Sequence, residues 1–514
     1  MRERVDLNKL ETVFYFVAWS GGIFYGLYQL FLAGVYFEDY DDAFNDFAPG
    51  WSWVGRKRDI SDIEWSLWIP FMYQLIPWVT IHLAFSQYLK WSECSSTTIC
   101  CWYIAISVAF LCHYVGVVAM IFLLTQPCIA CLLTSFRSKR IAYVIHFTTL
   151  GVIQLSSTLE IVTQDWLMLK ENVYHMIVIA VCWMQLRTIS CSIDNITDYK
   201  HRSLVGFLKN FIQSTAYCLY LPTLFLGPFI LYSDFIKGIE GPFKPWTFRR
   251  FSIFILNIAR FTFWIFFTEW SMHFVYCNAL QYHPEFVAQL DPWAFYAMGY
   301  AMGQYFLNKY VVFYGTCGEL SRADDINAPP PPKCIGRIHL YSEMWKHFDR
   351  GLYQFLIRYI YVPIASMEIP LKKILASFIS FGFVFLWHGV QLFIFTWSFL
   401  NFLGLIIEGI ARSIGNTPGF VEWEEKWLTT KNVRRFHCML ASPLLALSAI
   451  SNFYFFAGQD IGNIFIYRIF HDSPKAVGIL LFLLYCCCQV STEMKNHEMR
   501  KETKTDYDDV EKRM

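Results

Sequence analysis

The sequence predicts an all-α membrane protein whose chain crosses the bilayer many times. Hydrophobic residues make up 55% of the 514 residues and charged residues only 16%, whereas soluble domains average about 45–50% apolar and about 25% charged. Runs of apolar residues long enough to cross a bilayer core as a helix, which takes about 20 residues, recur along the whole chain. The interruptions between these runs are too short for separately folded domains.

Eleven apolar runs follow one another, and the ninth is long enough for two short or tilted helices. The runs are residues 11–35, 66–89, 99–125, 141–163, 173–193, 211–233, 251–278, 293–317, 374–411, 437–457 and 475–491. We therefore expect a bundle of roughly 10–12 transmembrane or re-entrant helices.

The charges outside these runs indicate the orientation and the domain boundaries. Arg2, Arg4 and Lys9 precede the first run, which favours a cytosolic N-terminus because basic residues accumulate on the cytosolic side. Residues 36–64 begin acidic and then turn basic. We expect one membrane domain over residues 1–491, with its core at 250–470, and a polar, solvated tail over residues 492–514.

Composition also excludes several classes of protein. The apolar content rules out disorder. Net charge is +1, from 42 basic and 41 acidic residues, so there is no basic excess with which to neutralise nucleic-acid phosphates. Most of the 16 cysteines fall inside apolar runs and form neither a disulfide framework nor a zinc-like spacing. Membrane lipids are therefore the expected surroundings, and the chemistry is expected in or beside the membrane.

One ionisable side chain stands out in the long ninth run. No Asp, Glu, Lys or Arg occurs from Ile374 to Ile407, yet His388 lies within this stretch, between Trp387 and Gly389. An ionisable group inside the hydrocarbon is costly and suggests a function, and histidine suits proton transfer near neutral pH. The alternative is a histidine that only forms a hydrogen bond between helices.

Two further residues have both a structural and a functional interpretation. Asp349 precedes the short apolar stretch 352–364, so it is either a helix N-cap or ion-pair partner or a carboxylate that faces a polar cavity. Cys334 follows a run of four prolines, and neighbouring Lys333 and Arg337 favour the thiolate that metal ligation requires. The alternative is an ordinary loop cysteine.

Taken in order, these motifs resemble the membrane-bound O-acyltransferase superfamily. The resemblance is carried by Trp345 four residues before Asp349, by the segment Leu-Ile-Arg-Tyr-Ile-Tyr-Val-Pro at 356–363, and by Trp387-His388-Gly389. Stretches at 62–68, 227–237 and 434–470 are similar to the branch of this superfamily that palmitoylates secreted signalling proteins.

The resemblance implies a helical bundle around a reaction tunnel that spans the membrane. It implies palmitoyl-CoA as the donor and the N-terminal cysteine of a secreted Hedgehog-type protein as the acceptor. The implied location is the endoplasmic reticulum membrane, with the Golgi as a second site. His388 and Asp349 match the catalytic residues of the superfamily, and the division of labour between them stays open.

Other residues receive roles from the same resemblance. Trp345 is implied to line the donor tunnel and Asn452 to line the reaction chamber. Arg358 and Tyr361 are assigned to binding of the substrate or acyl-CoA. Cys334 matches a haem-ligating cysteine, which implies haem b as a structural cofactor.

One departure from the family pattern leaves the substrates open. The family has Gly-Gly soon after the Tyr-x-Pro motif, whereas this chain has Ala365 and Ser366, which restrict close backbone approach. The departure therefore bears on the acyl chain and the acceptor rather than on the acyl-transfer chemistry. The alternatives are an acyltransferase with another acceptor, either a serine hydroxyl or a lipid, and a catalytically silent regulator of the secretory pathway.

Overall fold

The computed structural model describes residues 6–158, 160–167, 169–197 and 204–511. Arg2 and Arg4, on which the predicted orientation partly rests, lie outside these ranges. Within them the chain is almost entirely helical. The described strands are two residues long each, β1 (Phe47–Ala48) and β2 (Arg58–Asp59), and they pair antiparallel with Phe47 opposite Asp59.

Nine helices of the described residues are long and apolar enough to cross a membrane. They are α1 (Lys9–Phe37), α2 (Ile63–Trp91), α3 (Ser96–Tyr114), α4 (Gly116–Ser135), α7 (Glu171–Thr197), α10 (Phe248–Ser271), α18 (Leu392–Gly415), α20 (Thr430–His471) and α21 (Pro474–Glu511). The predicted fold class, an all-α polytopic membrane protein, is confirmed.

Four further long helices complete the bundle: α5 (Lys139–Thr158), α8 (Leu204–Cys218), α13 (Pro292–Ala323) and α17 (Lys372–His388). Shorter helices connect them: α6 (Glu160–Leu167), α9 (Tyr232–Glu240), α11 (Cys277–Leu280), α12 (Pro284–Gln289), α14 (Tyr341–His347), α15 (Arg350–Phe355), α16 (Val362–Ala365) and α19 (Pro418–Trp427). Three 3₁₀ turns, η1 (Asp41–Asp46), η2 (Leu221–Thr223) and η3 (Ile335–Arg337), and the π-helical segment η4 (Leu356–Tyr361) fill the gaps.

Glycines and prolines end several helices inside the predicted runs. The expected span 99–125 is instead two helices, α3 and α4, which meet where Gly116 adopts a φ of 82°. The expected span 211–233 is also not a single helix, because Pro222 and Pro228 cannot continue one. The expectation of two helices over 374–411 is confirmed, and Gly389, with a φ of 130°, separates α17 from α18.

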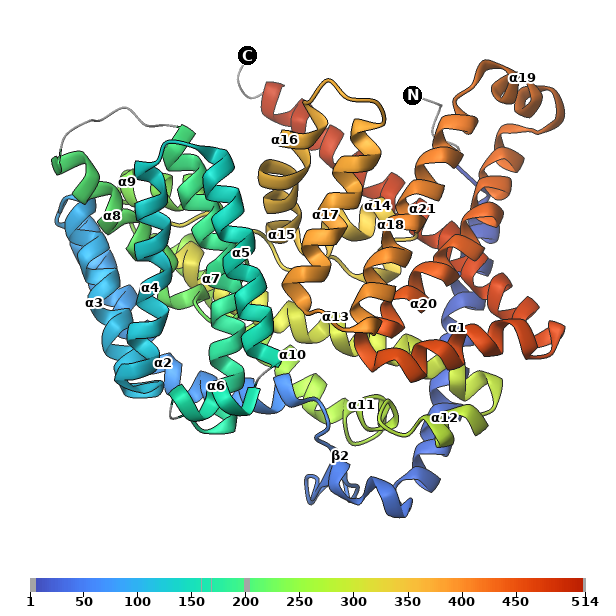
Figure 1. Cartoon of the computed structure of the whole chain (residues 1–514). Coiled ribbons are helices and arrows are strands. Elements are labelled where there is room, and N and C mark those ends of the chain that lie inside the picture. The colour runs from blue at the N-terminus through green and yellow to red at the C-terminus, as the bar shows by residue number, and fades with distance from the viewer. Residues whose placement is uncertain (1–5, 159, 168, 198–203, 512–514) are drawn as a thin grey trace.

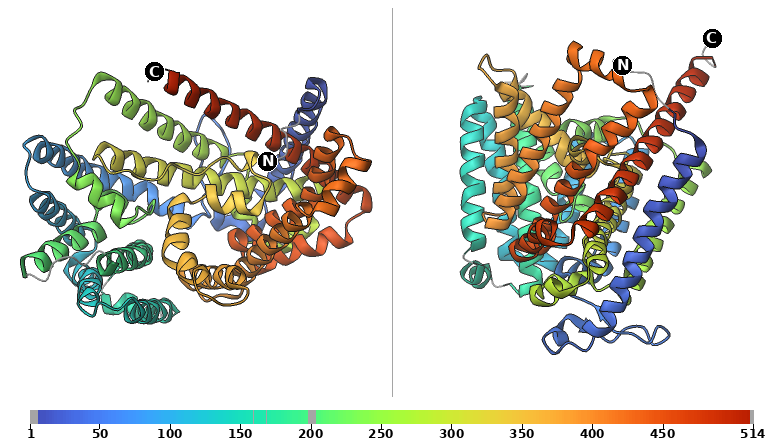
Figure 2. Two further views of the ribbon diagram at one scale, coloured as in Figure 1. Left: turned by 90° about the horizontal axis from the view of Figure 1, so that it is seen from above. Right: turned by 90° about the vertical axis from the view of Figure 1, so that its right-hand side faces the viewer.

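The helices form two groups with α13 running between them (Figure 1). Helices α3 to α9 lie on one side. Helices α14 to α21 lie on the other, and α1 joins them by packing along α13 and α21 although it is distant in sequence (Figures 1 and 2). Both chain ends lie on one face, here the terminal face, whereas η1, β1 and β2 lie on the opposite, hairpin face.

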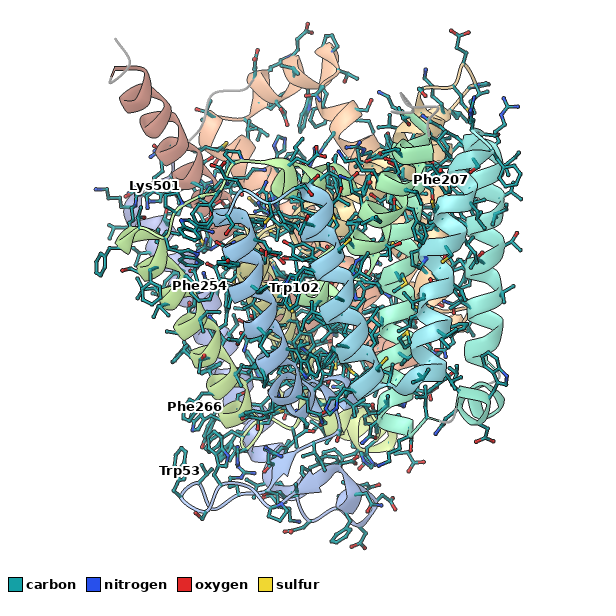
Figure 3. All side chains as sticks on the ribbon, turned by 90° about the vertical axis from the view of Figure 1, so that its left-hand side faces the viewer. Trp53, Trp102, Phe207, Phe254, Phe266 and Lys501 are labelled. Carbon is teal, nitrogen blue, oxygen red and sulfur yellow. The ribbon has the colours of Figure 1, made fainter. Side chains whose placement is uncertain are left out.

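Large apolar side chains cover the outside of the bundle, as Figure 3 shows along α10 and around Phe207 and Trp53. Phe266 is 53% exposed and Phe207 is 38% exposed. Such extended apolar surface is unfavourable in water and favourable against lipid. The outer face of the bundle therefore fits a hydrocarbon environment.

The last helix, α21, continues into the segment that the sequence predicts as a polar tail. Helix α21 continues past residue 491, and three of its charged side chains bind the body of the protein. These ion pairs join Glu493 to Arg434 at 2.7 Å, Lys495 to Glu343 at 3.1 Å and Glu498 to Lys333 at 2.6 Å. The end of α21 is thereby fixed to the terminal face.

A buried ionic cluster anchors the last residue before the proline-rich loop. The carboxylate of Asp324, which C-caps α13, accepts hydrogen bonds from Tyr103 at 2.6 Å and Tyr220 at 3.1 Å and pairs with Lys90 at 3.1 Å. His82 and Ser86 of α2 also reach it. One carboxylate therefore ties α2, α3 and the η2 segment to the end of α13.

Candidate active site

A cavity of about 550 Å³ lies among α1, α7, α13, α18, α20 and α21. This volume is in the range of small-molecule and cofactor sites. Its wall is mostly apolar and aromatic. Its carboxylate, imidazole and amide side chains come from Glu64, Asp349, His388, Asn401 and Asn452. The structure thus brings the two predicted catalytic residues, His388 and Asp349, to one cavity.

His388 is the last residue of α17, and its ring faces an aromatic cage. The helix ends there because Gly389 adopts a left-handed φ that other residues rarely take. The His388 ring centroid is 5.2 Å from that of Trp397 and 5.1 Å from that of Phe455, both at near-perpendicular angles. Among the described residues no hydrogen bond reaches its ring nitrogens, so these remain available to a molecule in the cavity.

Asp349 has both of the roles that the sequence leaves open: it N-caps a helix, and its carboxylate faces the cavity. Its Oδ1 accepts the Leu352 N–H at 2.8 Å and thus N-caps α15. Its Oδ2 accepts the Tyr314 hydroxyl at 2.9 Å, and the side chain lines the cavity. Asp349 lies outside the membrane-spanning helices, and burial raises its pKa above the ordinary value, although both hydrogen bonds oppose the rise. A carboxylate with a raised pKa is better suited to accept a proton.

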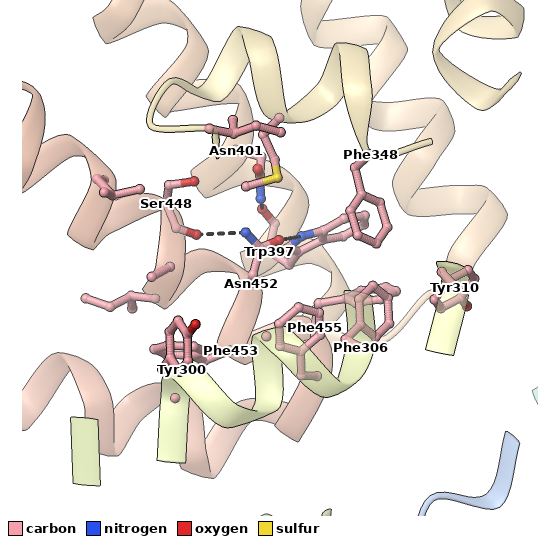
Figure 4. A pocket seen from close by; sticks show the side chains of 18 of the residues that line it. Tyr300, Phe306, Tyr310, Phe348, Trp397, Asn401, Ser448, Asn452, Phe453 and Phe455 are labelled. Atoms are coloured by element: carbon pink, nitrogen blue, oxygen red, sulfur yellow. Dashed lines mark hydrogen bonds between the residues drawn. The ribbon is translucent and has the colours of Figure 1, made fainter. Parts of the chain in front are cut away.

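Trp345 and Asn452 form hydrogen bonds with two residues of α18, Asn401 and Trp397. Figure 4 shows Trp397, Asn401 and Asn452 at the cavity. The Trp345 indole donates to Asn401 at 3.1 Å, and the Trp397 indole donates to Asn452 at 3.1 Å. Asn452 in turn donates to the Ser448 carbonyl at 2.9 Å. The network fixes two indole rings against each other, with centroids 5.8 Å apart, and so shapes the cavity.

Trp397 and Asn401 were not predicted from the sequence. Both lie in the charge-free stretch around His388, where a tryptophan resembles ordinary packing and a single asparagine is easily overlooked. The available signal was the spacing of four, which places both side chains on the same face of one helix.

Arg358 and Tyr361 do not line the cavity in the described part of the chain. Arg358 forms two hydrogen bonds of 3.0 Å with Asp194 and one of 3.1 Å with Ser233, so it joins η4 to α7 and α9. Their assignment to substrate binding stays a prediction. Ser366, in the departing segment, is exposed with a φ of −82°, a conformation open to any residue. Ser366, in place of the glycine of the family, therefore causes no backbone strain.

Cys334 lies in an exposed loop beside one arm of the cavity. A side chain added at Gly336 would meet the Trp19 ring at 3.1 Å and the Cys334 sulfur at 3.8 Å. The Cys334 thiol is exposed, and the position of Gly336 beside it is already closely packed by Trp19. In the described ranges no cluster of three His, Cys, Asp or Glu residues could hold a bare metal ion.

A second, basic pocket of about 250 Å³ adjoins the cavity at Ile338, which lines both. Its cationic side chains are Lys333, Arg337, Lys346 and Lys495. Two carboxylates, Glu343 and Glu498, pair with three of these cations.

Two histidines also border the basic pocket. Burial, together with the Lys495 ammonium, lowers the pKa of His339 to about 4, so this histidine is neutral near pH 7. The positive charge of the pocket therefore comes from its lysine and arginine side chains, which outnumber its two carboxylates.

A sequence profile of the membrane-bound O-acyltransferase family matches residues 131–451. This range includes Cys334, Trp345, Asp349 and His388, and it ends one residue before Asn452.

Three relatives resemble nearly the whole chain. A protein-cysteine N-palmitoyltransferase of Drosophila melanogaster, Rasp, is 28% identical and covers 98% of this chain and 99% of its own. The protein-cysteine N-palmitoyltransferase HHAT of Mus musculus is 26% identical over 85% of this chain and 88% of its own. A mouse HHAT-like protein is 24% identical over 99% of both chains.

Proposed function

The chain belongs to the membrane-bound O-acyltransferase family, and from this premise we propose that it transfers a palmitoyl group from palmitoyl-CoA to the N-terminal cysteine of a secreted protein. The observation that carries the proposal is the meeting of His388 and Asp349 on one apolar cavity. The names of two relatives, both protein-cysteine N-palmitoyltransferases, support an acceptor of this kind.

The donor enters from the terminal face in this proposal. The starts of α17 and α20 lie on that face (Figure 1) and carry Lys372, Lys373, Lys431, Arg434 and Arg435. The hairpin-face segment 38–64 holds eight acidic and three basic residues. Basic residues accumulate on the cytosolic side, so the terminal face is cytosolic, as palmitoyl-CoA requires.

The basic pocket suits the phosphates of coenzyme A. Lys333, Arg337, Lys346 and Lys495 offer ammonium and guanidinium donors of the kind that bind phosphate. Helix α14 connects the two sites, because Lys346 lines the basic pocket and its neighbour Trp345 lines the cavity. A phosphate group held at Lys346 would direct the thioester past Trp345 toward His388.

The chemistry needs little beyond positioning and proton transfer, because the thioester is already activated. The acceptor amine attacks the thioester carbonyl, a C–N bond forms and the C–S bond breaks. An ammonium acceptor loses two protons: one goes to the departing thiolate and the other to solvent. Asp349, with its raised pKa, accepts a proton from the amine, and His388 polarises the carbonyl or protonates the thiolate.

The apolar wall supplies the selection of the acyl chain. Each buried CH₂ contributes about 0.8 kcal/mol, so a cavity matched to sixteen carbons discriminates against shorter chains. We propose palmitoyl rather than another acyl group on this basis, with a Hedgehog-type signal as acceptor and the endoplasmic reticulum as the location.

We also propose haem b at Cys334, where it would have a structural role. The exposed Cys334 thiol and the flanking Lys333 and Arg337, which favour the thiolate, support this proposal. Purified protein should show a Soret band that Cys334→Ser shifts or removes. Protein without such a band after expression with a haem precursor would contradict it.

The function is tested with detergent-purified protein, alkyne-palmitoyl-CoA and a Hedgehog-type peptide that begins with cysteine. We expect label on the peptide amine with the natural chain and a loss of about 10²–10⁴-fold with His388→Ala. The matched control is His113→Ala, which removes an exposed histidine of α3. Label that persists in His388→Ala, or folded protein that binds the donor and labels no peptide amine, would contradict the proposal.

A further inference from the structure

Two tyrosines one turn apart on α13 each hold a carboxylate at the cavity wall. The Tyr314 hydroxyl donates to Asp349 at 2.9 Å, and the Tyr310 hydroxyl donates to Glu64 at 3.2 Å. All four side chains line the same cavity, and the two phenol rings are 5.1 Å apart. Residues four apart rise about 6 Å along a helix. The two carboxylates are therefore held by neighbouring turns of the same helix.

The Glu64 carboxylate is also bound by the ammonium group of a lysine that does not line the cavity in the described part of the chain. Lys309 Nζ lies 2.8 Å from Glu64 and 2.7 Å from Asp62, which N-caps α2. The Lys309 side chain is only 6% exposed and is not among the described residues that line the cavity. The Glu64 side chain is 26% exposed, so part of it faces the open space.

The charges around this end of the cavity do not balance. Three carboxylates, from Asp62, Glu64 and Asp349, face one ammonium, that of Lys309. Arg350 follows Asp349 in sequence but does not line the cavity in the described part of the chain. Among the described residues Asp349 forms hydrogen bonds but no ion pair, and Asp62 and Glu64 share the one ammonium. Buried carboxylates whose charge is not balanced are costly, so this end of the cavity has room for a cation that a ligand supplies.

We propose that Glu64 is a specificity-determining residue that binds the protonated amine of the acceptor beside Asp349. This inference rests on the proposed function and narrows it. A serine hydroxyl or an uncharged lipid would leave the excess negative charge unpaired, whereas a chain-terminal ammonium would pair with both carboxylates. Asp349 then accepts the proton, and Glu64 keeps the amine in position. The structure therefore points to an amine acceptor rather than a hydroxyl acceptor.

Glu64→Gln tests the inference because it keeps the shape of the side chain and removes its charge. We expect the KM for a peptide with a free N-terminal amine to rise at least tenfold, because hydrogen bonds between charged groups are the strong ones. The KM for palmitoyl-CoA should change less than twofold. Tyr310→Phe, which only loosens Glu64, should raise the peptide KM by a smaller factor. Glu240→Gln, which removes a carboxylate paired with Lys209 outside the cavity, should change neither KM.

Donor binding separates loss of folding from loss of recognition. If Glu64→Gln no longer binds palmitoyl-CoA, the test is read from Tyr310→Phe instead. An unchanged peptide KM in a variant that binds the donor would overturn the inference while leaving the proposed function intact. Equal competition by a peptide whose N-terminal amine is replaced by a hydroxyl would also overturn it. If the natural chain labels no peptide amine at all, the proposed function itself fails.

Discussion

Asp349 is held by two hydrogen bonds of different kinds, and only one of them comes from a side chain. The Leu352 N–H belongs to the backbone of α15, whereas the Tyr314 hydroxyl comes from α13. Both oppose the rise that burial causes in the Asp349 pKa. A substitution at Tyr314 can therefore change the pKa of Asp349 without removing the N-cap that Asp349 provides to α15.

Tyr314→Phe should shift the acid limb of the pH–rate profile to higher pH. In the proposed mechanism Asp349 accepts a proton only when it is ionised, so activity should fall as pH drops through its pKa. Loss of the Tyr314 hydroxyl raises that pKa further, and a hydrogen bond to a charged group corresponds to roughly one pH unit or more. The profile of kcat/KM against pH measures the shift. Tyr310→Phe, which leaves Asp349 untouched, should keep the acid limb in place, and an unmoved limb in Tyr314→Phe would contradict the role of Asp349.

The sequence predicted those residues of the site that belong to a recognisable motif. It missed residues that only the fold brings to the cavity. His388, Asp349, Trp345 and Asn452 all line the cavity. Glu64 was missed because an acidic residue in the first turn of a helix is expected there for its interaction with the helix dipole. Only the packing of α13 against α2 shows that Glu64 faces the same space as Asp349.

At the scale of elements, hydropathy located the helices but not their ends. Backbone conformation decided the ends: Gly116 and Gly389 both take a positive φ, and neither feature changes the hydropathy of a run. Helix α20 is similar, because Gly458, with a φ of 80°, divides it soon after Asn452 and Phe455 reach the cavity. The continuation of α21 past residue 491 also has no hydropathy signal, because the partners of its ion pairs lie more than fifty residues away in sequence.

Asp324→Ala should destabilise the protein although Asp324 lies outside the site. The substitution leaves Lys90, His82 and two phenols buried without their shared acceptor. Removal of one partner from a buried pair costs about 3–5 kcal/mol, so thermal unfolding in detergent should begin at a clearly lower temperature. Asp325→Asn, which alters a pair with the more exposed Arg250, serves as the control. Equal stability of the two variants would show that the cluster does not anchor α13.

At the scale of the whole molecule, the two faces differ in charge, and the cavity lies between them. The basic pocket joins the cavity at Ile338, and Glu64 and Asp349 line the cavity beside α13. An anionic donor and a cationic acceptor would therefore each be attracted to a different end. The anionic donor would be repelled by the carboxylates at the acceptor end, and the cationic acceptor would be repelled by the basic pocket.

Lys346→Ala should weaken donor binding without affecting the acceptor. Loss of one phosphate-binding cation is expected to raise the KM for palmitoyl-CoA by roughly three- to tenfold, and the difference should shrink at high salt because screening already weakens the interaction. Steady-state kinetics at two ionic strengths measure both effects. Lys373→Ala removes an exposed cation from the same face, outside the basic pocket, and is the control. A donor KM that ignores Lys346 would place the coenzyme elsewhere.

The unequal number of carboxylates and ammonium groups at the acceptor end also bears on turnover. In the proposed reaction, acylation would convert a charged amine into a neutral amide and so remove the charge that holds the acceptor. The neutral product would then leave the excess negative charge of this end unbalanced again, and no electrostatic attraction would hold the product there. Each catalytic cycle would thus lower the affinity of the enzyme for what it has just made, and a fresh ammonium-bearing chain would displace the finished one.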